Sequence, residues 1–414
     1  MDHIPTAHYH SPYATARHEG FKIAIGKSQS KDLLEAVHEV SRQCLAQLPA
    51  TEIDLAIAFS SPSFAVESLL KNLSLSLKLH SPLIGCSGMN IITSEGAQKE
   101  GLVLALLSLP GAKVSCGSIT LEQNKDTYAA GQELGAYLLS NVKGCRRELC
   151  LILSDGLSTN TLELIKGLQN TLGRSFPLIG GGASDNLEFK QTSQYYYEQL
   201  LNKGVVATIF AGKLSYGIGI RHGWKPLGKI RTVTESKANI IKKIDGKRAC
   251  HLYEDYFAKS LSELKKELLR INVLYPIGMY LQGENEYLLR NIISLNEDGS
   301  ITTQGDVPQE SAIRLMIGTK ESCLEAAEQA ALQVKNAMRH KKIEMALIIS
   351  AASRASILGR DINKEISIIK ETIGQDTPLL GFYSYGEFAP LGAMSYYGQT
   401  YLHNQAITIL GIGE

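Results

Sequence analysis

The sequence has no excess of charge of either sign. Its 42 Lys and Arg residues nearly balance its 41 Asp and Glu residues, which leaves a net charge of +1. A protein that binds nucleic acid usually presents a dense basic surface to the phosphates. The densest basic cluster, at residues 242–248, surrounds Asp245-Gly246, and this pattern is typical of a solvated hairpin turn. We therefore expect no nucleic-acid partner.

The sequence also has few cysteines and no long apolar run. Its 7 cysteines are odd in number and scattered, which indicates reduced thiols in a cytosol rather than a disulfide framework. No segment approaches the ~20 apolar residues of a membrane span. Residues 1–19 lack the apolar core of a signal peptide. These absences predict a cytoplasmic protein without membrane insertion, with residues 1–19 as a flexible lead-in.

Three familiar sequence motifs are missing. There is no phosphate-binding P-loop, no Gly-x-Gly-x-x-Gly dinucleotide fingerprint and no Gly-x-Ser-x-Gly nucleophile elbow. Their absence argues against nucleotide hydrolysis, nicotinamide chemistry and α/β-hydrolase catalysis.

What the sequence does contain is one short phrase that occurs three times. Pro-Leu-Ile-Gly stands at residues 82–85 and 177–180, and Pro-Leu-Leu-Gly at residues 378–381. The first two prolines are 95 positions apart and the last two 201, which is close to twice that spacing. Repetition at a fixed period indicates a repeated supersecondary unit.

The surroundings of the phrase repeat as well. Each copy is preceded by an apolar run without polar alternation, typical of a strand covered on both faces, and by a helical pattern. This pattern starts behind capping residues in the second and third copies and behind Pro62 in the first. One more apolar run follows each phrase. The predicted unit is therefore β-α-β-α-β-β. Since its last two strands have no helix between them, part of each sheet should be antiparallel.

The expected fold class is α/β with mixed sheets flanked by helices, in two lobes. The segment 225–311 does not fit the unit and is predicted to be an α+β insertion. The expected N-terminal domain spans 20–224 with units 20–109 and 112–212, and the expected C-terminal domain spans 225–414 with the segment 225–311 and a third unit 312–414.

The residues that follow each glycine differ between the three copies. Glycine lets backbone amides approach a ligand closely, and consecutive amides can form an anion-binding nest. The alternative is a tight turn that merely leaves a buried strand. If the turns do form a cleft, its ligand-binding residues are Gly85, Cys86, Ser87, Gly180, Gly181, Gly182, Ser184, Asp185, Tyr383, Tyr385, Gly386 and Glu387.

Several of these side chains leave two interpretations open. Cys86 is a candidate nucleophile if a histidine lies within hydrogen-bond reach, or simply a small residue packed in a turn. Asp185 and Glu387 can orient an amino group, or they can bond to their own loops. His222 can ligate a metal or haem, or it can cap the turn that holds Trp224, the only tryptophan of the chain.

From about Gly20 onward the chain resembles the FIST family (F-box and intracellular signal transduction proteins). The most specific match lies near the C-terminus, where the glycine turn is followed by two short polar motifs. The segments that carry the resemblance are Leu83–Ser87, Pro177–Ala183, Gly217–Gly219, His222–Trp224, Gly381–Glu387, Ala389–Pro390 and His403–Gln405.

The resemblance implies a sensory, ligand-binding role in signal transduction, with small molecules such as amino acids as suggested ligands. One bacterial subgroup of stand-alone two-part members binds haem, senses nitric oxide and regulates a partner histidine kinase. For that subgroup His222 or His403 would be the haem ligand here. The resemblance also adds Trp224, Asn404 and Gln405 to the ligand-binding candidates.

We therefore expect a cytoplasmic sensor and no enzyme. Two alternatives remain open at this point: an interaction scaffold without a small ligand, or an enzyme that uses Cys86 or the Tyr385 and Glu387 turn.

Overall fold

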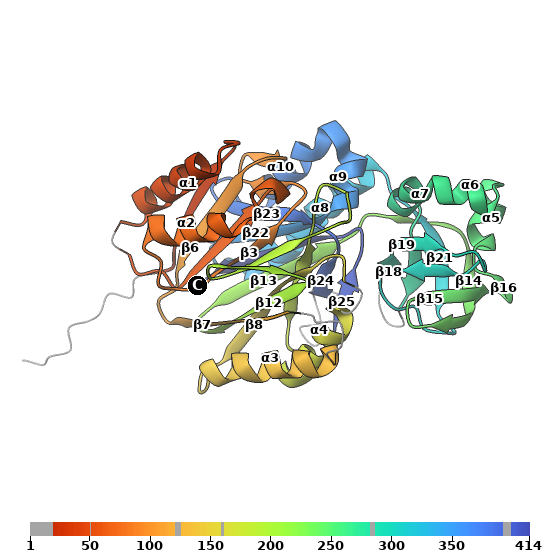
Figure 1. The fold of residues 1–414 in the computed structure, drawn as a ribbon, viewed down its shortest axis with the longest axis horizontal. Coiled ribbons are helices and arrows are strands. Elements are labelled where there is room, and N and C mark those ends of the chain that lie inside the picture. The colour runs from red at the N-terminus through yellow and green to blue at the C-terminus, as the bar shows by residue number, and fades with distance from the viewer. Residues whose placement is uncertain (1–19, 50, 121–125, 159–160, 282–285, 392–398) are drawn as a thin grey trace, which may run out of the picture.

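The computed structural model describes residues 20–49, 51–120, 126–158, 161–281, 286–391 and 399–414. Two bodies are visible in Figure 1: three repeat units on the left, and the insertion, with α5 to α7, on the right. Within the described residues, no helix is both long enough and apolar enough to cross a membrane.

The first two units follow the predicted order of helices and strands, and each adds a short hairpin before its last strand. The first unit consists of β1 (Lys22–Ser28), α1 (Leu33–Gln47), β2 (Leu55–Ser60), η1 (Pro62–Phe64), α2 (Glu67–Leu77), β3 (Leu83–Ser87), β4 (Ile91–Thr93), β5 (Gly96–Gln98) and β6 (Leu102–Ser108). The second consists of β7 (Ala112–Thr120), α3 (Thr127–Asn141), β8 (Arg147–Asp155), α4 (Thr161–Leu172), β9 (Leu178–Ala183), β10 (Ser193–Tyr196), β11 (Gln199–Asn202) and β12 (Gly204–Gly212).

The third unit is interrupted by the insertion. Its elements are β13 (Ser215–Arg221), α8 (Lys320–Met338), β22 (Met345–Ala351), α9 (Ala352–Leu358), η2 (Gly359–Asp361), α10 (Ile362–Ile373), β23 (Leu379–Ser384), β24 (Glu387–Pro390), β25 (Thr400–His403) and β26 (Ile407–Gly413). The insertion consists of β14 (Lys225–Lys237), β15 (Ile240–Ile244), β16 (Lys247–Arg248), α5 (His251–Phe257), α6 (Leu261–Lys266), α7 (Leu268–Leu274), β17 (Ile277–Tyr280), β18 (Tyr287–Arg290), β19 (Ile292–Leu295), β20 (Ile301–Thr303) and β21 (Ala312–Ile317).

The three units form sheets of the same topology. The strand orders β1-β6-β2-β3, β7-β12-β8-β9 and β13-β26-β22-β23 are equivalent. In each sheet the last two strands are parallel and the others antiparallel. The predicted mixed α/β fold is confirmed.

Each sheet is completed by a hairpin from a different unit. The β10–β11 hairpin of the second unit pairs with β3 of the first. The β24–β25 hairpin of the third pairs with β9 of the second. The β4–β5 hairpin of the first pairs with β23 of the third. We call this closed cycle of donated hairpins the hairpin ring.

The start of the third unit differs from the expectation. Residues 313–317 are a strand, as predicted, but this strand, β21, pairs with β14 and β17 in the sheet of the insertion. The position equivalent to β1 and β7 belongs to β13. Because β21 directly precedes α8 in sequence, its place in the chain is the one expected for the first strand of a unit. Close packing of β13 against α8 requires a glycine at position 219, because a Cβ on Gly219 would lie 1.9 Å from the carbonyl oxygen of Ala330 in α8.

The three units share one core, which corrects the expected pairing of the third unit with the insertion in one lobe. Alternate residues of β2 show the layers: Ile57 and Phe59 face the common core, whereas Ala56 and Ala58 pack under the outer helices. Phe59 and Phe382 join the first and third units, with ring centroids 4.8 Å apart. The insertion has a separate core of its own.

The glycine of the repeated phrase lies inside a strand and does not end it, contrary to the expected turn. At Gly85, Gly180 and Gly381 a Cβ would stand 1.8 Å from a carbonyl oxygen of the neighbouring parallel strand. The repeat therefore marks a close approach of two backbones, which only glycine permits.

Capping side chains fix the starts of α3 and α8, whereas the expected cap Asp361 makes no side-chain cap bond at α10. The Asp126 carboxylate accepts hydrogen bonds from the backbone N–H groups of Tyr128 and Ala129 at the start of α3. At α8, Thr319 and Ser322 form a reciprocal capping box. Such bonds satisfy amides that have no partner within the helix, and the second one fixes α8 where the chain returns from the insertion.

Candidate ligand cavity

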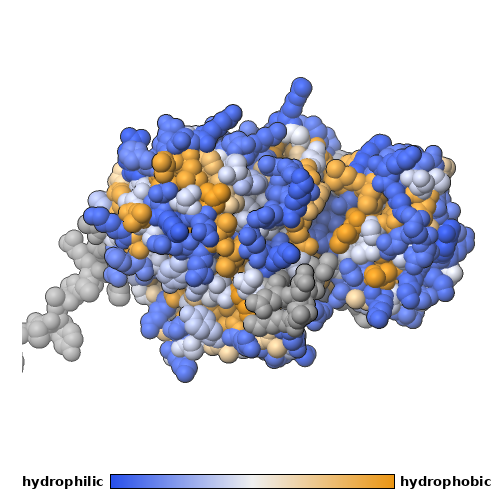
Figure 2. All heavy atoms as spheres, viewed as in Figure 1, coloured by the Kyte–Doolittle hydropathy of each residue, from blue (hydrophilic) through white to orange (hydrophobic). Residues whose placement is uncertain are grey.

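A cavity of about 1330 Å³ lies between the three-unit body and the insertion. The body contributes the carboxyl ends of β8, β22 and β23, and the insertion contributes α7, the start of β19 and the loop after β20. Figure 2 shows apolar surface on both bodies where they face each other. In α/β proteins the carboxyl ends of parallel strands are the usual position for a ligand, and a cavity of this size accepts a small organic molecule.

Only four of the predicted ligand-binding residues line this cavity. These are Gly182, Tyr385, Gly386 and Gln405. The other candidates lie behind the wall or within the core: Gly85, Cys86, Ser87, Gly180, Gly181, Ser184, Asp185, Trp224, Tyr383, Glu387, Asn404 and the two histidines His222 and His403.

A chain of side-chain amides connects the two bodies at one side of the cavity. Gln304 Nε2 donates to the backbone carbonyl of Tyr385 at 2.6 Å, so its Oε1 faces the other way. That Oε1 accepts from Asn291 Nδ2 and from Asn404 Nδ2, each at 3.0 Å. Gln405 Nε2 donates to Asn291 Oδ1 at 2.6 Å and to the carbonyl oxygen of Asn272 at 2.9 Å. Amides thus tie the body to the insertion on this side of the cavity, in addition to a buried apolar cluster that contains Leu289, Met316, Cys323 and Leu358.

Among the described residues, two polar atoms of the cavity lining are buried without a hydrogen-bond partner. They are Gln405 Oε1 and Ser353 Oγ. Buried polar groups are nearly always paired in folded proteins, so two such atoms in one cavity wall require an explanation.

Tyr385 and Asp185 shape the loop beside the cavity. The Tyr385 hydroxyl donates to Asp185 Oδ1 at 2.6 Å, and its ring stacks on Phe189 at 4.9 Å. Burial raises the pKa of Asp185, but hydrogen bonds from Tyr385 and from the amides of Lys190, Phe189 and Gln191 outweigh it and lower the pKa. Of the two interpretations of Asp185, the structure therefore shows the one in which it bonds to its own loop, whose Leu187 and Phe189 line the cavity.

Glu387 lies directly behind the cavity wall and is fully buried. Burial raises its pKa to about 8, against the opposing effect of a hydrogen bond to Ser384. The Ser384 hydroxyl lies 3.3 Å from the Ser350 carbonyl oxygen and 2.5 Å from Glu387 Oε1. The Ser384 hydroxyl donates to Glu387 Oε1, and Glu387 Oε2 accepts from the Ala406 amide at 3.1 Å. These bonds oppose the effect of burial on the pKa of Glu387 without cancelling it.

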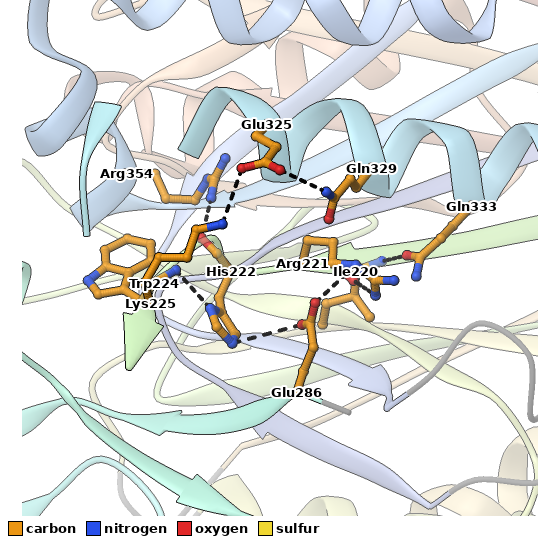
Figure 3. A network of polar contacts seen from close by, with 10 residues as sticks. All are labelled: Ile220, Arg221, His222, Trp224, Lys225, Glu286, Glu325, Gln329, Gln333 and Arg354. Atoms are coloured by element: carbon orange, nitrogen blue, oxygen red, sulfur yellow. Dashed lines mark hydrogen bonds and ion pairs between the residues drawn. The ribbon is translucent and has the colours of Figure 1, made fainter. Parts of the chain in front are cut away.

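The two candidate haem ligands are both engaged with other groups. The backbone N–H of Trp224 donates to His222 Nδ1 at 2.9 Å, so the proton of this imidazole sits on Nε2, 3.8 Å from Glu286 (Figure 3). His403 Nε2 donates to the Ala389 carbonyl at 3.0 Å. Burial lowers the pKa of His222 to about 3 and that of His403 to about 4, so both rings are neutral at physiological pH.

The side chains present do not fit a haem in the cavity. Neither His222 nor His403 lines it, and its described lining residues include no histidine, cysteine or methionine. The backbone carbonyl of His222 is held by Arg354 Nη1 at 2.7 Å (Figure 3). Arg354 in turn pairs with Glu365 deep in the third unit. The segment at His222 is therefore fixed within a buried polar network.

One metal-like cluster occurs elsewhere among the described residues. Ligand atoms of Cys250, His251 and Glu254 lie within 4.8 Å of one another in the insertion. The Arg248 guanidinium lies 3.2 Å from His251 Nε2, and its positive charge opposes a cation there. We assign no metal centre to this cluster.

Cys86, Ser87, Ser184 and Tyr383 have structural positions. Cys86 is part of the common core, and burial raises the pKa of its thiol well above 9, whereas reactive thiols have a lowered pKa and are accessible. The Ser87 hydroxyl donates to the Ser184 carbonyl at 3.0 Å, and the Ser184 hydroxyl donates to the Tyr383 carbonyl. These two bonds link the first, second and third units.

Asn291, Gln304 and Ser353 were missed by sequence reasoning. Two of them belong to the insertion, which has no repeat against which a deviation would show, and Ser353 stands in an ordinary apolar segment. Their importance arises from the meeting of two bodies, for which the sequence carried no local signal.

Comparison with known proteins identifies two matching family descriptions. The FIST N domain matches residues 54–247, and the FIST C domain matches residues 249–390. The uncharacterized protein MJ1623 of Methanocaldococcus jannaschii is 23% identical over 266 residues, which is 58% of this chain and 50% of that protein. The chain therefore spans about half the length of this curated relative.

Two solved structures of cyanuric acid hydrolase show a remote likeness. The enzyme from A. caulinodans is 7% identical with a TM-score of 0.34, and the match covers 94% of this chain and 99% of that one. A second cyanuric acid hydrolase structure gives a TM-score of 0.35 at 7% identity over 95% and 100% of the two chains. A likeness this distant carries no argument about function.

Proposed function

Because the chain belongs to the FIST family and contains both its N and its C domain, we propose that it is a sensory protein that binds a small molecule in the cavity between the three-unit body and the insertion. FIST domains are associated with sensing in signal transduction. The observation that carries the proposal is the position of the 1330 Å³ cavity, whose walls come from both bodies.

This position gives a ligand a way to act on the conformation. The insertion joins the body through two short connections, after β13 and before α8. A ligand that touches both bodies binds more tightly when they are close together, and such differential affinity is what shifts a conformational equilibrium. Closure of two bodies around a ligand is a common form of this shift.

The bodies are joined by polar contacts and by a buried apolar cluster that contains Leu289 and Met316 of the insertion and Cys323 and Leu358 of the body. Arg290 Nη1 donates to the Leu402 carbonyl at 3.0 Å, and the Asn291 amide donates to Asn404 Oδ1 at 3.1 Å. At the edge of the cavity Lys166 pairs with Asp306 at 3.1 Å. Relative motion is the usual expectation for two domains unless their interface is large and hydrophobic.

We further propose that the closed form is read by a signalling partner such as a histidine kinase, in the cytoplasm. Small molecules such as amino acids are the ligand class that the family suggests. The scaffold alternative differs in one measurable respect: it requires no small ligand, whereas a sensor is stabilised by its ligand through mass action.

The test compares a cavity-filling variant with a matched control. Ser356 and Ser367 are both exposed helical serines whose hydroxyls donate to the carbonyl four residues earlier, but only Ser356 lines the cavity. A library of amino acids and other small metabolites is screened by thermal shift. A hit should stabilise the wild type and Ser367→Trp but not Ser356→Trp. If no compound stabilises the wild type, the scaffold alternative replaces the sensor.

The possibility that the sensor binds haem has a separate spectroscopic test. His403 would have to leave the Ala389 carbonyl to bind haem, whereas Nε2 of His222 has no hydrogen-bond partner among the described residues. A Soret band that appears on addition of hemin to the wild type and is lost in His222→Ala or His403→Ala would support it. A protein that stays colourless removes haem from the proposal and leaves the small-ligand sensor intact.

A further inference from the structure

We propose that the ligand carries an N–H donor group on an apolar body, and that this group binds Gln405 Oε1 with Ser353 Oγ as a second contact. The inference rests on the proposed function and specifies the chemistry of its ligand. The relevant groups are amides, ureas and ammonium ions.

The first argument is that the direction of the amide chain is fixed at both ends. The carbonyl oxygen of Tyr385 can only accept, so Gln304 must turn its NH₂ group toward it. Gln304 Oε1 then faces Asn291, which must present its own NH₂ group and turn Oδ1 toward Gln405. The Asn272 carbonyl imposes the same orientation on Gln405. Both partners of Gln405 Nε2 are acceptors, and a flipped amide would place oxygen against oxygen.

The second argument is that Gln405 Oε1 is left without a donor in a buried place. Gln405 is 1% exposed, and its Oε1 has no partner among the described residues. Its backbone φ of +64° lies in the left-handed region, which non-glycine residues adopt rarely. An unpaired buried acceptor and an unfavourable backbone at one residue are features that cluster at ligand sites. A ligand donor would satisfy the acceptor.

The third argument comes from Ser353 at the start of α9. Its hydroxyl is also buried and without a partner among the described residues, and the residue lines the same cavity. A hydroxyl can donate or accept. Ser353 therefore suits a second polar atom of the ligand, such as the carbonyl oxygen of an amide or urea.

The other residues that line the cavity determine the chemistry of the rest of the ligand. Leu187 and Phe189 line one side, and Leu269 and Ile293 of the insertion line the other, where they remain 54% and 47% exposed. Covering such side chains stabilises a complex by the hydrophobic effect. A carboxylate at Gln405 would instead face an acceptor oxygen without a hydrogen between them. The site therefore favours an apolar molecule with a donor head over an anion.

The experiment uses four benzene derivatives of similar size as probes: benzamide, methyl benzoate, benzoate and benzylamine. Binding to the full chain is measured by titration calorimetry. Benzamide or benzylamine should bind at least tenfold more tightly than methyl benzoate, which lacks a donor, and more tightly than benzoate. The comparison of benzamide with benzylamine separates a neutral donor from a cationic one.

Two variants assign the effect to the site. Gln405→Met keeps the length of the side chain without its acceptor, and it should abolish the preference for benzamide over methyl benzoate. Ser353→Ala removes only an unpaired hydroxyl, so it should fold normally and reduce benzamide affinity severalfold. Ser367→Ala on α10 lies outside the cavity and serves as the control.

The outcomes separate this inference from the proposed function. Equal affinity for benzamide and methyl benzoate, both lost in the cavity-filling Ser356→Trp, overturns the donor chemistry and retains a ligand cavity. Unchanged benzamide affinity in both Gln405→Met and Ser353→Ala also overturns it. Failure of every probe to bind the wild type counts against the inference and the proposed cavity together.

Discussion

Glu387 shows how one buried residue makes the stability of this protein depend on pH. Its pKa is raised to about 8 by burial from an ordinary value of 4.5. A group whose folded pKa is raised contributes stability that is complete below its unfolded pKa and is lost as the pH rises through the folded one. His222 and His403 act in the opposite direction, because their lowered pKa values give stability that is present above 6.5 and lost as the pH falls.

Between pH 6.5 and 8, therefore, Glu387 is the one of these three residues whose contribution to the free energy of unfolding still changes with pH. We expect the wild type to lose about 2 kcal/mol of unfolding free energy across this range relative to Glu387→Gln, since each pH unit is worth about 1.4 kcal/mol. The glutamine is isosteric and can donate to Ser384 while accepting from Ala406. Urea unfolding at several pH values measures the difference. Parallel pH profiles for both proteins would contradict a neutral Glu387.

The site residues were predictable in part, and the reason is visible at individual positions. The glycine phrase led to Tyr385 and Gly386, which line the cavity, because polar residues after buried strands are often near ligands. It led equally to Cys86 and Glu387, whose side chains turn into the interior. The direction of a side chain near the end of a strand depends on tertiary pairing that a single sequence does not display. Gln304 and Asn291 could not be found for the same reason.

At the scale of elements, the long helices and the buried strands were predicted well and the short hairpins were not. Residues 320–338 form α8 and residues 205–211 lie within β12, as the apolar patterns indicated. The strands β4 and β24 were read as parts of ligand-binding turns or overlooked. They have only 3 and 4 residues, and each joins its sheet by pairing with a strand of another unit, which no local pattern could reveal.

The parallel strand pairs depend on the glycine of the repeated phrase. A Cβ at Gly381 would lie 1.8 Å from the Ile348 carbonyl oxygen in β22, and two buried strands cannot separate without disturbing the core. We expect Gly381→Ala to lower the unfolding free energy by at least ~3 kcal/mol, as measured by denaturant unfolding.

The control for this substitution is Gly144→Ala. Gly144 has a positive φ of 78° and open space around a Cβ, so it reports only the left-handed strain of about 1–2 kcal/mol. Equal losses for both variants would show that the close backbone approach in the core is unimportant.

At the scale of the whole molecule, the boundary between the two family domains does not coincide with the boundary between the two structural bodies. The boundary between the FIST N and FIST C matches falls at residues 247–249, at the strand β16, which pairs with β15 in the insertion. The structure divides instead into the three-unit body and the insertion, each with its own core. Sequence repetition could identify the units, but it could not show that they exchange hairpins.

This division predicts different outcomes for two truncations. Residues 20–212 alone should aggregate or associate, because β9 loses the β24–β25 hairpin and β4–β5 loses β23, which exposes strand edges. Replacement of residues 225–317 by a short Gly-Ser linker should leave a three-unit body that unfolds cooperatively. Light scattering and thermal unfolding distinguish the two. A monomeric, cooperatively folded 20–212 fragment would disprove the structural importance of the hairpin ring.

The hairpin ring also has a consequence for synthesis on the ribosome. The Leu379 amide donates to Ser94 Oγ at 2.9 Å across 285 residues of chain, where the β4–β5 hairpin of the first unit meets the third. At about 5–20 residues per second, the ribosome needs roughly 15–60 s to add that length. Throughout this interval the hairpin has emerged but its partner strand does not yet exist. The nascent protein must therefore hold an unpaired edge in solution until translation is almost finished, which makes it a natural client for chaperones that bind exposed strands.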